Sequence, residues 1–305
     1  MTQPVFRRFL GIDWSGAEGE YHSSIQVAQF SCDTKRLQSV TPPNSPQWSR
    51  QSVLEYIRSQ ADQRTLIGLD FGFSLPWHGS NCLPACFERL QNARELWAYV
   101  ENFCEKAPFF HGGPIWLSEE SPFRPFLKCW SRKFQHEGLL FNGGLLRKAE
   151  KAAKAEGFQP KSIYRMAGPQ VGMGSFAGMR ILHALGRVSK ENIAIWPFDE
   201  TERAKVVVVE VYPAVFYRRA GQTRPTNTQV KNGTHLEIVR KAVQFFEIES
   251  EADIPHSIDA MDAFVSAAAL FSLSKKPAAF HVSDDTTISA KEGWIFGLPS
   301  FRSGS

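Results

Sequence analysis

Hydrophobic residues fall in short runs that predict a sheet. Residues 8–13, 65–70 and 205–213 are apolar almost throughout, as strands buried on both faces are. Residues 24–31 alternate apolar and polar positions, and 36–41 form a weaker strand after them. The spacing of the first three strands predicts an antiparallel meander, with the strand at 65–70 parallel to the first. The run at 205–213 predicts a central parallel strand.

Helical periodicity appears between and after these strands. Residues 49–61 carry apolar side chains at helical spacing, with Ser49 or Ser52 as the N-cap. An Ala-, Lys- and Glu-rich run at 145–156 stops at Gly157, which predicts a helix with a glycine C-cap. Further helices are predicted at about 234–246 and 256–273.

The hydrophobic pattern becomes less regular between the predicted strands at 65–70 and 205–213. We therefore interpret residues 1–305 as a single domain with an insertion or cap at about 77–200. Within it, Gly168–Gly178 predicts a glycine-rich turn that leads into a helix at 179–185. Such a turn either presents backbone N–H groups to a phosphate or is a plain flexible loop.

Acidic residues close three of the predicted strands. Asp13, Asp70 and Glu210 lie at the C-terminal ends of their apolar runs, where α/β sheets bind ligands. The last predicted helix adds Asp259 and Asp262, which share one helix face because they are three residues apart. Small residues on this helix, Ala263 and Ala267–Ala269, would let it lie close to the sheet. We expect the acids to converge on one patch.

Carboxylates this close repel one another and stay ionised only beside a compensating cation. Oxygen ligands without thiolates suit Mg²⁺ or Mn²⁺. Two such ions activate a water molecule and stabilise the leaving oxygen in phosphodiester hydrolysis. The alternative for each acid alone is structural: a turn cap, an arginine partner or an acid in the first turn of a helix. His256, just before the last helix, is a candidate general base or a structural residue.

Charge is distributed unevenly along the chain. The formal net charge is +4, but ten basic and three acidic residues lie between 124 and 165. A local surplus of this kind attracts a polyanion such as nucleic acid, although a solvated helix face is the plainer interpretation. The candidate substrate-binding residues are Arg132, Lys133, Arg147, Lys148 and Lys151.

Five cysteines in 305 residues do not indicate a disulfide scaffold. No apolar run is long enough to span a bilayer, and the N-terminal residues lack a long apolar segment. A cytoplasmic protein without a membrane partner is expected. The sequence carries no signal of oligomeric state.

Several short motifs together resemble an uncharacterised family described as predicted RNase H-like nucleases. They are Gly11–Ala17, Gly68–Asp70, Glu210–Pro213, Asp259–Ala263 and Glu292–Ile295. The Asp-x-x-Asp-Ala helix preceded by His256 is also similar to the last catalytic helix of Holliday-junction resolvases.

The resemblance implies an α/β fold with a mixed five-stranded sheet in the order 3-2-1-4-5, flanking helices and a large insertion. It also implies a nuclease with two divalent ions. Asp13 would bridge both ions, with Asp70 on one side and Asp262, together with Asp259, on the other. Glu210 lies on a strand that is not the usual source of a ligand in nucleases.

Two other functions are compatible with the pattern. Asp13-Trp-Ser-Gly and Asp70-Phe-Gly look like the phosphate turns of actin-like, ATP-using phosphotransferases, although Trp14 and Phe71 are large for such turns. In a non-catalytic nucleic-acid-binding module, the acids would be structural and the basic region would bind.

Overall fold

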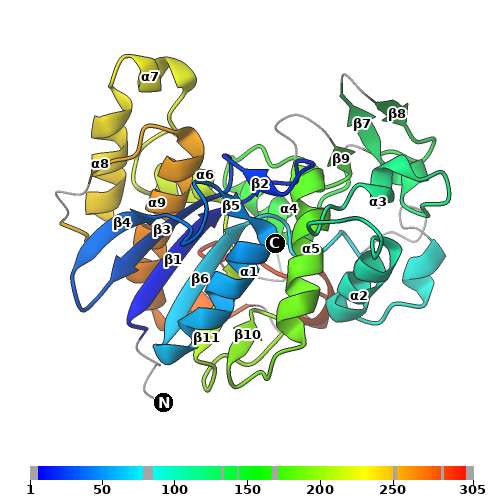
Figure 1. The fold of residues 1–305 in the computed structure, drawn as a ribbon, viewed down its shortest axis with the longest axis horizontal. Coiled ribbons are helices and arrows are strands. Elements are labelled where there is room, and N and C mark those ends of the chain that lie inside the picture. Colours follow the sequence, from blue (N-terminus) through cyan, green and yellow to red (C-terminus); the bar gives the residue numbers. More distant parts are fainter. Residues whose placement is uncertain are drawn as a thin grey trace.

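The computed structural model describes residues 6–77, 85–131, 134–142, 144–166, 171–249, 253–282 and 285–299. They form a mixed α/β fold around a six-stranded sheet in the order β10-β11-β6-β1-β3-β4 (Figure 1). Its strands are β1 (Arg8–Asp13), β3 (Gln26–Ser31), β4 (Arg36–Val40), β6 (Thr65–Asp70), β10 (Ile193–Ile195) and β11 (Val206–Glu210). The sheet contains all five predicted strands. β10 was not predicted, because a three-residue strand carries no periodic signal.

Strand directions agree with the predictions. β1 pairs antiparallel with β3, and β3 with β4, which gives the meander. β1 pairs parallel with β6. β11 lies between β6 and β10, parallel to both, and all of its residues are buried. The continuous apolar run at 205–213 therefore correctly predicted a central parallel strand.

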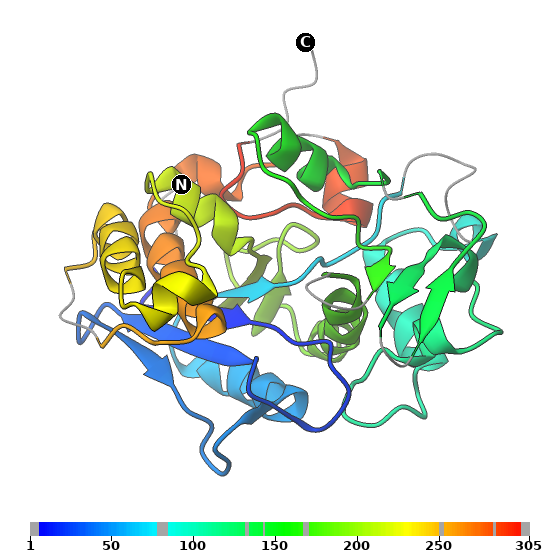
Figure 2. The same ribbon diagram turned by 90° about the horizontal axis from the view of Figure 1, so that it is seen from above.

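Helices cover both faces of the sheet. The first face is covered by α1 (Arg50–Ser59) and α5 (Val171–Gly186), with α2 (Ala93–Phe103) packed on α5, and the second by α6 (Pro213–Arg219), α8 (His235–Phe245) and α9 (Ile258–Ser274). Ser49 is the N-cap of α1 and forms a capping box with Ser52. Figure 2 shows α1 (light blue) on one side of the strands and α8 (yellow) and α9 (orange) on the other.

α9 lies directly on the centre of the sheet because Gly11 of β1 has no side chain. A Cβ at Gly11 would come within 2.0 Å of the Ala263 carbonyl oxygen and 2.7 Å of the Ala267 nitrogen. Ala263 and Ala267 are themselves buried. The close approach predicted from the small residues of this helix is confirmed, and it brings the first turns of α9 to the C-terminal end of β1.

The glycine-rich stretch expected as a turn is a helix from Val171 onward. A Cβ at Gly172 would lie 2.3 Å from the Ile163 carbonyl oxygen, and one at Gly178 would lie 2.3 Å from the Phe71 ring. These glycines permit close packing of α5 against its neighbours and do not form a loop. Residues 167–170 of the predicted turn lie outside the described residues.

A smaller group of elements lies beyond α5, beside the central sheet (Figure 1). It contains α3 (Pro114–Leu117) and a second sheet of β8 (Gln135–Glu137), β7 (Lys128–Trp130) and β9 (Arg165–Met166). The predicted insertion at 77–200 includes this group. It also includes α5 and β10, which belong to the central body.

The remaining elements are short, except α4. They are β2 (Tyr21–His22), β5 (Trp48–Ser49), α4 (Lys148–Ala155), α7 (Asn227–Lys231) and the 3-10 or π turns Gln60–Asp62, Ala85–Glu88, Arg124–Phe126, Pro277–Phe280 and Ile288–Glu292. α4 ends before Gly157, whose φ is +85°, as the predicted glycine C-cap requires. In the described ranges, no helix combines the length and apolar character needed to cross a membrane.

Candidate metal centre

Three aspartates meet at the C-terminal edge of the sheet. Asp13 and Asp70 are direct partners in the parallel register of β1 and β6, so their side chains leave the same face. α9 covers that face and adds Asp262. One carboxylate oxygen from each lies within 4.8 Å of the others. This convergence of Asp13, Asp70 and Asp262, hereafter the acid triad, was predicted from the sequence.

The acid triad lies in a cleft of about 980 Å³. Asp259 also lines this cleft, half-buried in the first turn of α9, but it is not part of the cluster of three. A smaller pocket of about 300 Å³ shares four lining residues with the cleft: Asp70, Val171, Tyr212 and Arg224. The two hollows are therefore adjacent, with Asp70 at their boundary.

Burial and mutual repulsion shift the acid triad toward its neutral form. Burial, followed by the charges of Asp70, Asp262 and Asp259, raises the pKa of Asp13 well above its ordinary value, and Arg224 opposes this. Burial and then the charge of Asp262 raise the pKa of Asp70 to about 8. Burial raises the pKa of Asp262 to about 6 against the hydrogen bond from Arg224. Three ionised carboxylates here call for a cation.

The raised pKa values predict a pH-dependent stability of the metal-free protein. An unfolded aspartate titrates near pH ~3.9, whereas Asp70 holds its proton up to about pH 8, so the native state binds the extra proton between these values. The free energy of unfolding must therefore fall as the pH rises through this window. We expect Asp70→Asn, which mimics the neutral acid, to match the wild type near pH ~4 and to be more stable by several kcal/mol near pH ~8.5, at about 1.4 kcal/mol for each pH unit of the window.

Thermal unfolding in a chelating buffer, followed across this pH range for both proteins, measures the effect. The difference between the two curves cancels the contribution of the histidines. Parallel curves would contradict the raised pKa of Asp70. Added Mg²⁺ should stabilise the wild type most at the alkaline end, because there the site is ionised.

The residues present are suited to a hard divalent cation. All three donors are carboxylate oxygens, the ligand type that Mg²⁺ and Mn²⁺ prefer. Asp262 is 1% exposed, and its Oδ1 is buried without a hydrogen-bond partner among the described residues. A buried carboxylate oxygen without a partner is costly unless a cation completes it. The acid triad can hold a metal ion.

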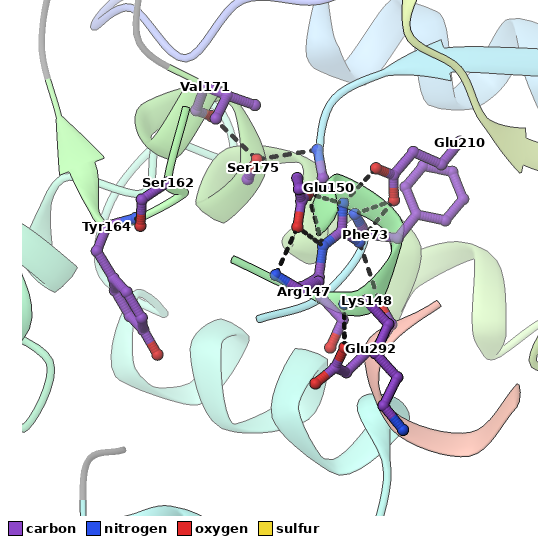
Figure 3. A network of polar contacts seen from close by, with 12 residues as sticks. Phe73, Arg147, Lys148, Glu150, Ser162, Tyr164, Val171, Ser175, Glu210 and Glu292 are labelled. Atoms are coloured by element: carbon purple, nitrogen blue, oxygen red, sulfur yellow. Dashed lines mark hydrogen bonds and ion pairs between the residues drawn. The ribbon is translucent and has the colours of Figure 1, made fainter. Parts of the chain in front are cut away.

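Glu210 does not join the acid triad, contrary to expectation. Glu210 pairs with Leu69 of β6, one residue before Asp70. Because side chains alternate along a strand, this offset of one residue places Glu210 on the opposite face of the sheet. Its carboxylate instead forms an ion pair with Arg147 and accepts a hydrogen bond from the Phe73 N–H at 2.8 Å (Figure 3).

Arg147, predicted to bind substrate, lies at the centre of a buried polar network (Figure 3). It is 1% exposed, and its guanidinium binds the carboxylates of Glu150 and Glu210 and the carbonyl oxygen of Glu292. The Glu292 carboxylate accepts hydrogen bonds from the backbone N–H of Lys148 and Trp77, at 2.7 Å each. The run of basic residues in the sequence did not indicate that the Arg147 side chain is buried. The network around Arg147 joins α4 to the ends of the central strands.

The other predicted substrate-binding residues that the structure describes both lie on α4. Lys148 pairs with Asp285, and Lys151 is exposed on α4. Arg132 and Lys133 lie outside the described residues. The three predicted residues that the structure describes thus lie at α4 or its N-cap, and Arg147 and Lys148 are held in ion pairs.

His256 lines the cleft and is oriented by a second histidine. Its Nδ1 lies 3.2 Å from Nε2 of the buried His235, whose Nδ1 lies 3.2 Å from the Gln229 carbonyl oxygen. A carbonyl only accepts, so His235 donates from Nδ1 and, in the neutral pair, its Nε2 accepts from His256. This arrangement leaves the Nε2 lone pair of His256 available. No local pattern indicated His235, which lies 21 residues before His256 in the chain.

Arg224 is the functional residue most clearly missed from sequence. It donates from Nε to Asp262 Oδ2 at 2.6 Å and lines both the cleft and the smaller pocket. It comes from an irregular segment between α6 and α7, where no hydrophobic period places it. The only local signal is Pro225, which holds the preceding residue in an extended conformation.

The turn after Asp13 is stabilised by residues on the sheet face that α1 and α5 cover. The Trp14 ring is 8% exposed and packs on Phe71, with centroids 5.2 Å apart. The buried Arg50 donates to the carbonyl oxygens of Ser15 and Ala17. Trp14, which also lines the cleft, therefore anchors the turn in the core.

Comparison of the chain with protein-family models, curated proteins and solved structures found no match. The interpretation of the site therefore depends on its geometry and chemistry.

Proposed function

We propose that this protein is a divalent-metal-dependent phosphodiesterase, most specifically a nuclease with an RNase H-like sheet. The observation that carries the proposal is the acid triad at the carboxyl ends of two parallel strands, completed by a helix packed on the same face. The strand order supports the RNase H-like assignment. In chain order, the five predicted strands lie as 3-2-1-4-5, with β10 added at the edge.

Asp13, Asp70 and Asp262 would hold Mg²⁺ or Mn²⁺, with Asp259 assisting from the rim. Two bound ions would supply an activated water and charge stabilisation of the leaving oxygen. The chain itself would supply the proton acceptor, His256 Nε2, whose lone pair is kept available by the His235 relay. The apolar surroundings of the buried acids would strengthen each of these electrostatic interactions.

The cleft suits an extended anionic substrate better than a small neutral one. It is about three times the volume of the adjacent pocket and is lined by four aspartates that require cations. Lys161 and Asp70 both line the smaller pocket. Nucleic acid, whose backbone repeats the phosphodiester, is the proposed partner.

The direct test is cleavage of a panel of single- and double-stranded DNA and RNA, with Mg²⁺, Mn²⁺ or a chelator. We expect cleavage with either metal and none with the chelator, restored when metal is returned. Activity that persists in the chelator, or no cleavage of any substrate with any metal, would contradict the proposal. Stabilisation by ATP with no cleavage would favour the phosphotransferase alternative.

A further inference from the structure

Arg224 is distinguished by its surroundings. Among the described residues that line the cleft, four are aspartates and Arg224 is the one arginine or lysine. Its segment is bounded by Gly221, with a φ of +68°, and by Thr226, which caps α7 in a capping box with Gln229. Pro225 restricts the backbone of Arg224 itself. The guanidinium is thus presented to the acids from a defined loop.

The contact with Asp262 is one-sided. Arg224 Nε and a terminal guanidinium nitrogen both reach Oδ2 of Asp262, while Oδ1 has no hydrogen-bond partner in the described structure. Asp262 is 1% exposed at its side chain, whereas Arg224 is 47% exposed. The guanidinium therefore reaches in from the surface to a buried carboxylate, and about half of the arginine side chain stays exposed.

In this position Arg224 competes with a metal ion for the carboxylates of the acid triad. Its positive charge compensates the acid triad, and the same charge repels a divalent cation bound to those carboxylates. A guanidinium also matches the oxygens of a phosphate in a bidentate geometry, and such contacts are stronger than neutral hydrogen bonds. Because Arg224 lines both hollows, an oxyanion held by it would lie between the acid triad and the smaller pocket.

We propose that Arg224 alternates between two partners: Asp262 in the metal-free protein, and a phosphate oxygen of the substrate once metal occupies the acid triad. Arg224 thereby competes with the metal in the resting site and binds substrate in the loaded one. The identity of the substrate rests on the proposed function. The competition with metal does not require cleavage.

The first test is Mg²⁺ binding by calorimetry. The pH is kept above the pKa of Asp70, so that proton release on binding does not mask the change in Mg²⁺ affinity. We expect Arg224→Gln to bind Mg²⁺ about fivefold more tightly than the wild type, and Arg224→Lys to gain less because it keeps the charge. Arg240→Gln is the matched control. Arg240 is 51% exposed and forms an ion pair with Glu237 on α8. Equal or weaker binding by Arg224→Gln would overturn the competition.

The second test uses inorganic phosphate as the probe, with the protein saturated in Mg²⁺. Thermal stabilisation by phosphate should fall about tenfold in apparent affinity for Arg224→Gln and remain unchanged for Arg240→Gln. Undiminished phosphate binding by Arg224→Gln would overturn the substrate-binding role. The two variants must first show the circular dichroism of the wild type.

The outcomes separate this inference from the proposed function. If the wild type cleaves nothing but Arg224→Gln binds Mg²⁺ more tightly and loses phosphate, the nuclease proposal fails and the role of Arg224 stands. If nucleic acid is cleaved and the Arg224 variants match the wild type in both assays, the reverse holds. If none of the proteins binds Mg²⁺, both proposals fail.

Discussion

Asp13→Asn should lose metal-dependent cleavage by about 10³-fold, the scale seen when one member of a charge-stabilising site is removed. Asp13 is the central acid: it is the register partner of Asp70 and is also raised in pKa by the charges of Asp262 and Asp259. Asparagine keeps the shape and hydrogen-bonding capacity of the side chain but removes the charge that binds the metal. Single-turnover cleavage at saturating Mg²⁺, together with calorimetric Mg²⁺ affinity, measures the effect.

The other aspartates should divide into two classes. Asp70→Asn and Asp262→Asn should resemble Asp13→Asn, because their oxygens lie within the same 4.8 Å cluster. Asp259→Asn should cost only about tenfold, since a half-buried acid at the rim acts through longer-range charge. An Asp259 variant as impaired as the other three would show that this residue is a direct ligand. Full activity of Asp13→Asn would remove the metal mechanism.

Glu210→Gln should destabilise the protein by about 3–5 kcal/mol, the usual effect of breaking a buried ion pair. Glu210 is 3% exposed, and its neutralisation would leave the buried Arg147 with less compensating charge. Burial raises the pKa of Glu210 while the Arg147 guanidinium lowers it, so the pair depends on both partners. Chemical denaturation at neutral pH measures the loss.

The matched control is Glu237→Gln, in an exposed ion pair with Arg240 and Lys241 on α8. Surface pairs contribute little, so no measurable change is expected. At a temperature where Glu210→Gln remains folded, its Mg²⁺ affinity should equal that of the wild type. A selective loss of Mg²⁺ affinity without loss of stability would show that Glu210 acts at the metal site.

Local pattern was sufficient for five of the six strands of the central sheet and for the three acids of the acid triad. Apolar runs ending in Asp13 and Asp70 identified two strands, and in parallel strands such ends meet at one edge. Ala263 and its small neighbours indicated a helix able to approach β1, which the glycine at position 11 makes possible. These inferences succeeded because strand burial and close helix packing leave regular, short-range marks on the sequence.

Contacts that join distant segments could not be predicted in this way. The exclusion of Glu210 depends on one residue of register between β11 and β6. The burial of Arg147 depends on a carboxylate 63 residues further along the chain and a backbone carbonyl 145 residues further along, as well as on its neighbour Glu150. Neither the strand register of Glu210 nor the distant partners of Arg147 can be inferred from the residues next to them in the chain.

The sequence by itself determined the alternation of strands and helices, the acids at the strand ends and the helix that carries Asp262. Only the tertiary structure decided which acids share a face, that Arg224 binds Asp262 and that His235 orients His256. The reason is physical: hydrophobic periodicity reports how each segment meets the core, whereas a polar site is set by register and loop placement between segments far apart in the chain.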